Sequence, residues 1–248
     1  MMELSVVLPS YLEGENLSLL LPRLHDVLKE TGLSYEILVV DTPKEMDNTP
    51  DVCRKAGATY VNRAPTECFG DAVRTGLRTS RGEFVIFMDA DGSHAPEFLP
   101  KLIEHRQNYD VVIASRYIDG GFTENSLALV WMSRLLNLTY SLILGLKYKD
   151  ISNSFKLYRG QALRELTLKT DKFDIVEEIL FKLSQRNRKL RVLEVPFTFR
   201  KRMFGETKRS LISFVFSYIV TIIRLRFFIG ADDQAAIAND KKITNAKT

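Results

Sequence analysis

Apolar residues in the first half of the chain form short continuous runs, which alternate with longer segments where apolar residues recur every three or four positions. The continuous runs predict buried strands at 4–8, 35–40, 59–61, 84–88 and 110–115. The spaced segments predict helices at about 16–29, 49–56, 69–80 and 96–107. Strands that alternate with helices are typical of a mainly parallel sheet, so the sequence predicts an α/β fold.

The second half of the chain has longer apolar segments and a less regular alternation. We expect a long apolar helix at 126–146, an extended segment at 151–158, helices at about 159–168 and 174–186, and a strand at 191–199. No linker interrupts the chain before about residue 230, and the residues that follow are mostly polar. We therefore expect one domain over 1–210, a helix over 211–230 and a disordered tail over 231–248.

Residues 211–229, LISFVFSYIVTIIRLRFFI, form the chain's long apolar stretch. A bilayer span needs about 20 mostly apolar residues, and arginines such as Arg224 and Arg226 are costly inside a membrane. A basic, aromatic-rich, amphipathic helix that lies in the membrane interface fits this composition better. A helix packed on the domain and a true membrane span remain the alternatives.

Charge and composition narrow the class of partner. With 45% hydrophobic residues among 248, the chain has enough apolar side chains for a sizeable core. The net charge is +4, and basic residues gather late, at 186–191, at 199–209 and at Arg224 and Arg226. This distribution favours phosphate groups or an anionic membrane surface. No nucleic-acid recognition motif is present, so nucleic acid is not expected as a partner.

The cysteines and the first residues bear on location. Cys53 and Cys68 have neither the spacing of metal ligands nor the pattern of a disulfide scaffold. The first residues, MMELSVVLPS, contain no visible signal peptide. We expect a cytoplasmic protein that associates peripherally with the cytoplasmic face of a membrane.

The segment FVIFMDADGSH, residues 84–94, carries the clearest chemistry. A buried strand there ends in Asp89 and Asp91, at the edge where open α/β sheets bind ligands. Carboxylate oxygens suit Mg²⁺ or Mn²⁺, whose coordination is usually completed by substrate phosphates. The pair therefore indicates a site for a metal and a diphosphate, although two aspartates in a solvated loop are a common alternative.

Six segments in a fixed order resemble one enzyme family. They are VVLPSYLEGENL at 6–17, YEILVVD at 35–41, the segment 70–103 that contains Asp89 and Asp91, DVVIASRYIDGG at 110–121, LGLKYKDISNSFKLYR at 144–159, and VPFTFRKRMFGETK at 195–208. Together they resemble glycosyltransferase family 2, within it the group of dolichol-phosphate (polyprenyl-phosphate) mannosyltransferases, over roughly residues 4–210. The resemblance implies a GT-A fold, a Rossmann-like sheet that binds a nucleotide-diphosphate sugar.

The resemblance also implies which residues hold the nucleotide. The family's P-x-Y-x-E segment points to Pro9, Tyr11 and Glu13, with Leu12 where the family usually has asparagine. From the residues alone, the favoured role of Pro9 and Tyr11 is to end a strand and pack on its edge.

A second nucleotide-binding segment departs from the family pattern. Asp41 matches the first acid of the family's V-D-D-G-S-x-D-G-T segment, whereas Thr42 replaces the second. Asp47 corresponds to the later acid only after a one-residue insertion, and capping of the next helix is an alternative role for it. The donor therefore stays open between GDP-mannose and a UDP-sugar.

For the reaction, the resemblance implies a metal ion, Mg²⁺ or Mn²⁺, on Asp89 and Asp91, with both aspartates and Arg116 catalytic and Asp89 also contacting the nucleotide sugar. It places Arg116, Arg134, Arg202 and Lys208 at the acceptor phosphate, with Arg202 and Lys208 in a segment similar to the family's R-x-x-G-E-S-K loop. Arginine suits this role because its planar fork donates two hydrogen bonds to phosphate.

The acceptor follows from the absence of an obvious general base. Glu177 and Glu178 are nearest to where hydroxyl-directed relatives keep one, and both fit a helical pattern. A lipid phosphate needs no base, because it is already anionic at neutral pH. This absence, the basic late segment and the expected membrane helix favour polyprenyl phosphate as the acceptor. The resemblance implies that the reaction is an inverting transfer of a hexose, with mannose as the expected sugar. Transfer to a glycan or other hydroxyl, and a non-catalytic nucleotide-sugar-binding protein, are the alternatives.

Overall fold

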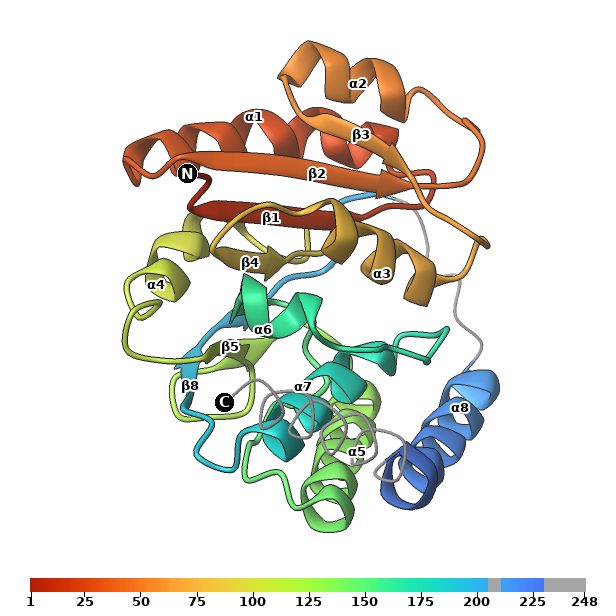
Figure 1. The fold of residues 1–248 in the computed structure, drawn as a ribbon. Coiled ribbons are helices and arrows are strands. Elements are labelled where there is room, and N and C mark those ends of the chain that lie inside the picture. Colours follow the sequence, from red (N-terminus) through yellow and green to blue (C-terminus); the bar gives the residue numbers. More distant parts are fainter. Residues whose placement is uncertain (205–210, 230–248) are drawn as a thin grey trace, which may run out of the picture.

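The structure is a computed structural model that describes residues 1–204 and 211–229, the side chains of 211–217 and 228–229 excepted. A seven-stranded sheet in the order β3-β2-β1-β4-β7-β5-β8 forms its centre (Figure 1). The strands are β1 (Leu4–Pro9), β2 (Tyr35–Asp41), β3 (Thr59–Asn62), β4 (Phe84–Phe87), β5 (Val111–Ser115), β7 (Lys156–Arg159) and β8 (Val192–Pro196). Only β7 runs antiparallel to its neighbours, so the expected mainly parallel sheet is confirmed.

Helices cover both faces of this sheet because successive strand residues point to opposite sides. On one side lie α1 (Gly14–Glu30), α2 (Thr49–Ala56), the 3₁₀ turn Pro96–Phe98 and α4 (Leu99–Ile103). On the other lie α3 (Phe69–Thr79), α6 (Gly160–Arg164), α7 (Ile175–Arg186), α5 (Leu127–Leu144) and α8 (Leu211–Arg224). In β1, for example, Val6 packs in the core on the side of α1 and α2, and Val7 packs in the core on the side of α3 and α7.

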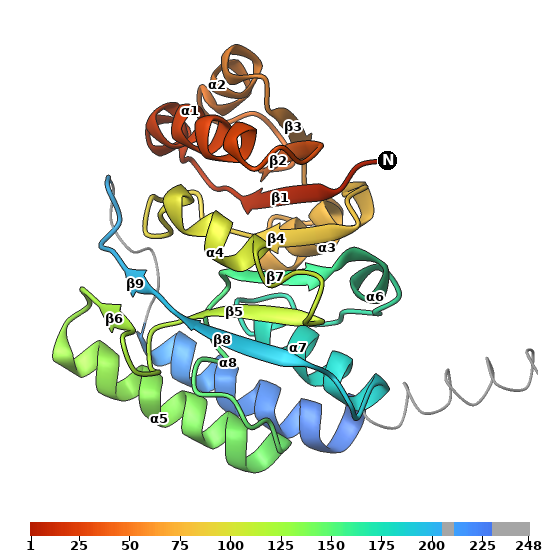
Figure 2. The same ribbon diagram turned by 90° about the vertical axis from the view of Figure 1, so that its left-hand side faces the viewer.

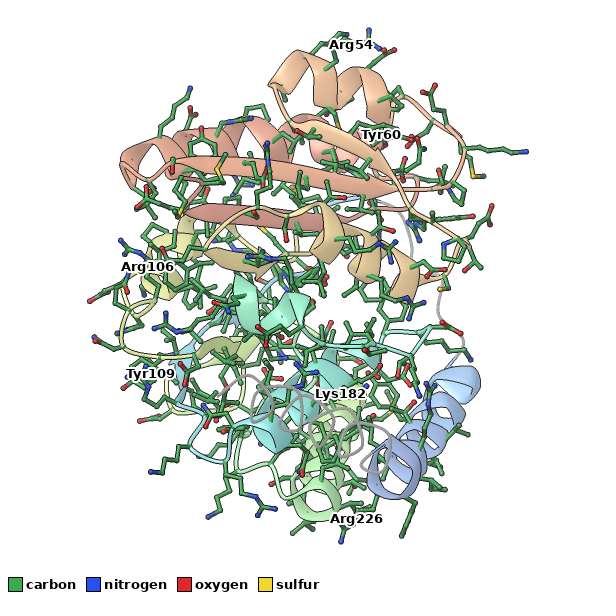
Figure 3. The ribbon with its side chains drawn as sticks, viewed as in Figure 1. Arg54, Tyr60, Arg106, Tyr109, Lys182 and Arg226 are labelled. Carbon is green, nitrogen blue, oxygen red and sulfur yellow. The ribbon has the colours of Figure 1, made fainter. Side chains whose placement is uncertain are left out.

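The helices α5 and α8 form an outer layer of the molecule, where they lie side by side (Figure 2). Tyr140 of α5 packs edge-on against Tyr218 of α8, with 5.7 Å between ring centroids. A π-helical turn, Leu225–Ile229, continues α8, and Arg226 projects outward from it (Figure 3). A small second sheet pairs β6 (Phe122–Thr123) with β9 (Thr198–Phe199) just before α5 begins.

The outer faces of both helices are apolar and exposed. The exposed large apolar residues on α5 are Leu127, Leu129, Trp131, Leu135, Leu138, Leu142 and Ile143, and those described on α8 and its continuation are Ile219, Val220, Ile223 and Phe227. Among the described residues, α5 is the helix that is long and apolar enough to cross a bilayer, with a mean hydropathy of 1.5 over 18 residues. The helix expected at 211–230 thus packs one side on the domain and leaves the other side uncovered.

Arg63 joins the strand ends that position the site. Its buried guanidinium donates to the carbonyls of Ser10, Asp41, Glu67 and Cys68, at 3.0 Å for Asp41 and 2.9 Å for Glu67. These carbonyls belong to the ends of β1 and β2 and to the turn before α3. One buried side chain therefore joins three segments of the chain at this edge of the sheet.

Four expected elements differ in the structure. The helix expected at about 159–168 ends at Arg164, and the strand expected at 191–199 divides into β8 and β9, which lie in different sheets. The helix expected over 96–107 is a 3₁₀ turn followed by one α-helical turn, since the amide of Arg106 bonds three residues back to Ile103 rather than four. The extended segment expected at 151–158 becomes a strand only at Lys156. The residues before it form a loop, in which the carbonyls of Ile151 and Asn153 accept hydrogen bonds from the Lys156 ammonium instead of pairing with a neighbouring strand. The tail at 231–248 lies outside the described residues.

Leu12 adopts a left-handed backbone conformation, with φ of 56°. Leucine is strained there, whereas asparagine tolerates this region. Because Leu12 is 38% exposed, little packing is lost on replacement. We expect Leu12→Asn to raise the free energy of unfolding by about 1 kcal/mol in urea titration. Leu19→Asn, at an exposed helical position, is the control expected to lower it. An unchanged or lower stability of Leu12→Asn would contradict the strain.

Candidate active site at the carboxyl ends of the strands

The topology brings the polar residues of several loops to one edge of the sheet. The parallel strands β1, β2, β4 and β5 end there, and the antiparallel β7 begins there. Asp41, Asp89 and Arg116 therefore follow strands that end at the same edge, as the sequence predicted. This edge is where open α/β sheets bind their ligands.

The carboxylates of Asp89 and Asp91 are oriented by neighbouring serines. Asp89 Oδ1 accepts a 2.9 Å hydrogen bond from Ser154, and Asp91 Oδ1 accepts from the amide and hydroxyl of Ser93 at 3.0 and 2.6 Å. Each bond leaves the second oxygen of the carboxylate available for another ligand. Hard, oriented carboxylate oxygens are the donors that Mg²⁺ and Mn²⁺ prefer, so these residues fit such an ion.

His94 holds the turn that carries these aspartates. It is fully buried, its ring stacks on Phe155 at 4.7 Å, and its Nδ1 accepts a 2.9 Å bond from the Asp89 amide. Burial lowers the pKa of His94, although the charges of Asp89 and Asp91 oppose this. The neutral ring is therefore a structural support that fixes the backbone of Asp89.

Asp41 is a buried carboxylate at the end of β2. It is 1% exposed, and neither of its oxygens has a hydrogen-bond partner within the described part of the chain. Burial raises the pKa of Asp41, and the nearby charge of Asp47 adds to this. A buried acceptor without a protein donor is costly, which makes Asp41 a candidate for binding the N–H groups of a ligand.

Asp47, by contrast, is engaged by the backbone. Its Oδ1 accepts from the amide of Thr49 at 2.9 Å and its Oδ2 from the amide of Gly14 at 3.1 Å. The carboxylate thus joins the first turns of α1 and α2. The capping role that the sequence left open is the one that the geometry supports.

Residues 200–204, which we call the strap, run across the aspartate turn. The amide of Arg200 bonds to the carbonyl of Ser93 at 3.1 Å, and that of Met203 bonds to the carbonyl of Asp91 at 3.0 Å. Met203 also packs on Gly92, whose φ of +81° and lack of a side chain permit this close approach. The strap therefore lies directly against the candidate metal site.

The strap is joined to the β1 loop by an ion pair. Arg202 Nη2 lies 2.7 Å from Glu13 Oε1, and the amide of Phe204 donates to Asn16 at 3.1 Å. Burial raises the pKa of Glu13, which the hydrogen bond from Asn16 and the charge of Arg202 oppose. Glu13 and Arg202, expected at the donor and the acceptor respectively, thus contact each other. Lys208 lies outside the described residues.

Asp150 holds the guanidinium of Arg116 in a bidentate ion pair. Its Nε and Nη2 lie 2.8 and 2.7 Å from the two carboxylate oxygens, and its own amide donates to Asp150 at 2.8 Å. Burial alone would lower the pKa of Arg116, but the Asp150 charge outweighs burial and raises it. The guanidinium is therefore a fixed cation at the end of β5.

Arg134 shares a cleft with Arg116. Both guanidinium groups lie over the ring of Tyr117, at 4.9 Å for Arg116 and 5.4 Å for Arg134. The cleft has a volume of about 300 Å³, and its wall includes Leu127 and Val130 from the first turns of α5. It therefore combines two cations with the beginning of the exposed apolar face of α5.

The two glutamates considered as bases are both fully buried. Glu178 accepts from the amides of Lys169 and Thr170 at 2.9 and 2.8 Å and pairs with Lys182 at 3.1 Å, so it supports a loop. Burial raises the pKa of Glu177 to about 8, against the opposing charge of Lys156. A base that deprotonates an acceptor must be reached by it, and neither glutamate is exposed to solvent.

Several supporting residues were not foreseen from the sequence. Arg63, Asp150 and Ser154 all contact site residues that are remote in sequence, with 53 positions between Arg63 and Ser10 and 65 between Ser154 and Asp89. Such distant pairings leave no periodic pattern. The signal that was available is the polar run DISNS before β7, at the edge where the other site loops meet.

Solved structures with the same fold include glucosyl-3-phosphoglycerate synthase from Mycobacterium tuberculosis. Its complex with Mn²⁺, uridine diphosphate and glucosyl-3-phosphoglycerate has a TM-score of 0.69 and 18% identity, over 91% of this chain and 80% of that one. Its complex with Mg²⁺ and uridine diphosphate has a TM-score of 0.68 at 18% identity, over 91% and 79% of the two chains. These similarities show the GT-A fold.

Several relatives found by sequence have a higher identity to this chain than these solved structures have. A dolichol-phosphate mannosyltransferase of Pyrococcus furiosus is 34% identical over 94% of this chain, which spans 66% of that relative's length. An undecaprenyl-phosphate mannosyltransferase of Micrococcus luteus is 33% identical over 84% of this chain and 88% of its own. A polyprenol monophosphomannose synthase of Mycolicibacterium smegmatis is 34% identical over 83% of this chain and 80% of that relative's length.

The family assignment rests on these relatives and on a direct match to the family. Residues 5–167 match Glycosyl transferase family 2, and this range includes Asp41, Asp89, Arg116 and Arg134. The matched range includes the carboxyl ends of β1, β2, β4 and β5, which meet at the sheet edge described above. The chain therefore belongs to glycosyltransferase family 2, where it resembles the polyprenyl-phosphate mannosyltransferases.

Proposed function

We propose that this protein transfers mannose from GDP-mannose to a polyprenyl phosphate, with inversion at the anomeric carbon, at the surface of a membrane. The observation that carries the proposal is the cleft in which Arg116 and Arg134 meet the apolar face of α5. A polyprenyl phosphate has the matching chemistry, because an anionic head is joined directly to an apolar chain.

The acceptor head would lie between the two arginines. The charge of Arg116 is balanced in part by Asp150, whereas Arg134 lies over Tyr117 at the cleft wall. Arg134 would therefore supply most of the attraction for the phosphate, and Arg116 would fix its orientation. The isoprenoid chain would follow Leu127 and Val130 onto the outer face of α5.

The buried state of Glu177 and Glu178 supports an anionic acceptor. A hydroxyl acceptor needs a base within hydrogen-bond reach to remove its proton. A phosphate oxygen is already ionised at neutral pH and attacks the anomeric carbon without proton transfer. The residues of this chain then have only to place the acceptor in line with the leaving diphosphate.

The donor would occupy the edge formed by β1, β2 and β4, with Pro9 at the end of β1 and Tyr11 in the loop that follows it. Asp41 supports guanine as the base, because its two unpartnered oxygens match the adjacent N–H groups of guanine. Uracil presents a single N–H group to such a carboxylate. GDP-mannose rather than a UDP-sugar is therefore the donor that we propose.

Asp89 and Asp91 would hold Mg²⁺ or Mn²⁺ together with the donor diphosphate. When bound, such an ion offsets the negative charge that the leaving nucleoside diphosphate gains. Ser154 and Ser93 fix the two carboxylates in advance, and His94 fixes the backbone of Asp89, so the ligands do not have to reorganise when the donor binds.

The outer faces of α5 and α8 would rest in the membrane interface. Neither helix contains an acidic residue, and exposed basic residues, Lys147, Lys149 and Arg226, lie at their ends. An apolar face with a basic border complements a bilayer that contains anionic lipids. The neighbouring cleft would then open at the depth where the phosphate of the acceptor resides.

Asp91→Asn tests the metal site. We expect the variant to retain its fold and to lose transfer by about 100-fold or more, because a neutral amide is a poor ligand for Mg²⁺ or Mn²⁺. GDP release from GDP-mannose measures the effect, with Asp26→Asn on the exposed surface of α1 as the control. Turnover of Asp91→Asn equal to that of the control would remove Asp91 from the site.

Arg134→Gln tests the acceptor cleft. Loss of a charged hydrogen bond to phosphate is expected to raise KM for a short-chain polyprenyl phosphate by about tenfold or more, with KM for the donor unchanged. Arg188→Gln, at an exposed position outside the cleft, controls for net charge. An acceptor KM that stays at the value of the control would contradict this role for Arg134.

The double variant Leu135→Ser/Leu142→Ser tests the membrane-facing surface. Both leucines are exposed on α5, and the loss of their apolar area should lower partitioning onto anionic vesicles by about tenfold or more. Co-sedimentation with vesicles measures this, and Leu19→Ser on α1 is the matched control. Undiminished sedimentation of the double variant would show that the outer face of α5 does not contact the bilayer.

A further inference from the structure

Asn137 is a buried amide in the middle of the apolar helix α5. It is 2% exposed and faces the domain, whereas the helix carries leucines on its outer face. Its Nδ2 donates to Ser152 Oγ at 3.0 Å, and its Oδ1 accepts from the Ser152 amide at 2.9 Å. Nδ2 also donates to the carbonyl of Ser133 at 2.9 Å. The side chain therefore clamps one residue of a distant loop from both sides.

The residue that it clamps is in direct contact with Arg116. Ser152 Oγ accepts a hydrogen bond from Arg116 Nη2 at 3.1 Å, while the rest of the fork is held by Asp150 two residues earlier. Both partners of the guanidinium thus belong to residues 150–154, which we call the bridging loop. The position of Arg116 depends on where this loop lies.

The bridging loop is fixed at its other points as well. Ser154 donates to Asp89 Oδ1 at 2.9 Å, and Asn153 donates to the carbonyl of Ala114. From within the core, the ammonium of Lys156 donates to the carbonyls of Ile151 and Asn153. The clamp from Asn137 is the attachment that comes from α5, on the same side as the acceptor cleft.

Packing alone does not account for asparagine at this position. A buried amide is costly in an apolar helix unless its groups are used. Here Nδ2 donates to the carbonyl and hydroxyl of Ser133 within α5, and the other two hydrogen bonds join Asn137 to Ser152. Thr139 on the same helix offers a contrast, because its hydroxyl bonds only to the carbonyl of Leu135 within α5. The polar groups of Asn137 are directed at the loop that holds Arg116.

We infer that Asn137 is a positioning residue that acts through Ser152 to set the orientation of Arg116 toward the acceptor phosphate. The inference rests on the proposed function, since it takes the phosphate to bind beside Arg116. The helix that would contact the lipid and the cation that would contact its phosphate are then joined by a single pair of side chains. Acceptor binding depends on this pair, and donor binding does not.

The test compares Asn137→Ala, Ser152→Ala and the double variant with the control Thr139→Ala. We expect each single variant to raise KM for a short-chain polyprenyl phosphate by about tenfold, with KM for GDP-mannose near that of the control. Because the two residues act as one unit, the double variant is expected to cost no more than either single variant. Ser152→Thr, which keeps the hydroxyl, is expected to restore most of the affinity.

Three results would overturn the inference. They are a wild-type acceptor KM in both single variants, equal increases in the donor and acceptor KM values, and additive losses in the double variant. If Asn137→Ala does not fold, Ser152→Ala and Ser152→Thr decide the question between them. Wild-type protein that transfers no sugar to polyprenyl phosphate would contradict the proposed function, and the inference with it. Normal transfer with unaffected variants would contradict the inference alone.

Discussion

The buried ion pair between Arg116 and Asp150 is the constraint on which the site depends. The side chain of Asp150 is fully buried and that of Arg116 is 10% exposed, so their charges would be costly without complete hydrogen bonding. The carboxylate of Asp150 accepts two hydrogen bonds from the guanidinium of Arg116 and one from its backbone amide. The pair fixes the bridging loop against the end of β5. Through Ser154 and Ser152, the same loop reaches Asp89 on one side and α5 on the other.

The charges of the site are arranged in two groups. Carboxylates gather at the ends of β2 and β4, where Asp41, Asp89 and Asp91 would contact the base and the metal-bound diphosphate of a donor. Cations gather at the end of β5 and on α5, where Arg116 and Arg134 would contact the phosphate of an acceptor. The strap lies beside the first group and ends in the ion pair between Arg202 and Glu13. This separation would keep the two anionic substrates of the proposed reaction in distinct places while their reacting ends meet.

The sequence predicted the parts of this arrangement that have a local pattern. The apolar run at 37–40 is followed by Asp41, and the apolar run at 84–88 is followed by Asp89. This pattern indicated both the sheet and the aspartates at its edge. The antiparallel direction of β7 was not predicted, because an apolar run does not encode the direction in which a strand pairs. The contact of Glu13 with Arg202 was not predicted either, since 189 positions separate them.

The most direct measurement is the release of nucleoside diphosphate by purified protein with Mg²⁺ or Mn²⁺, from GDP-mannose and from UDP-glucose, with and without a short-chain polyprenyl phosphate. Our account predicts release from GDP-mannose that requires the lipid phosphate and yields a mannosyl phosphate that mild acid hydrolyses. Release that does not depend on the lipid, or an acid-stable glycoside as product, would contradict it.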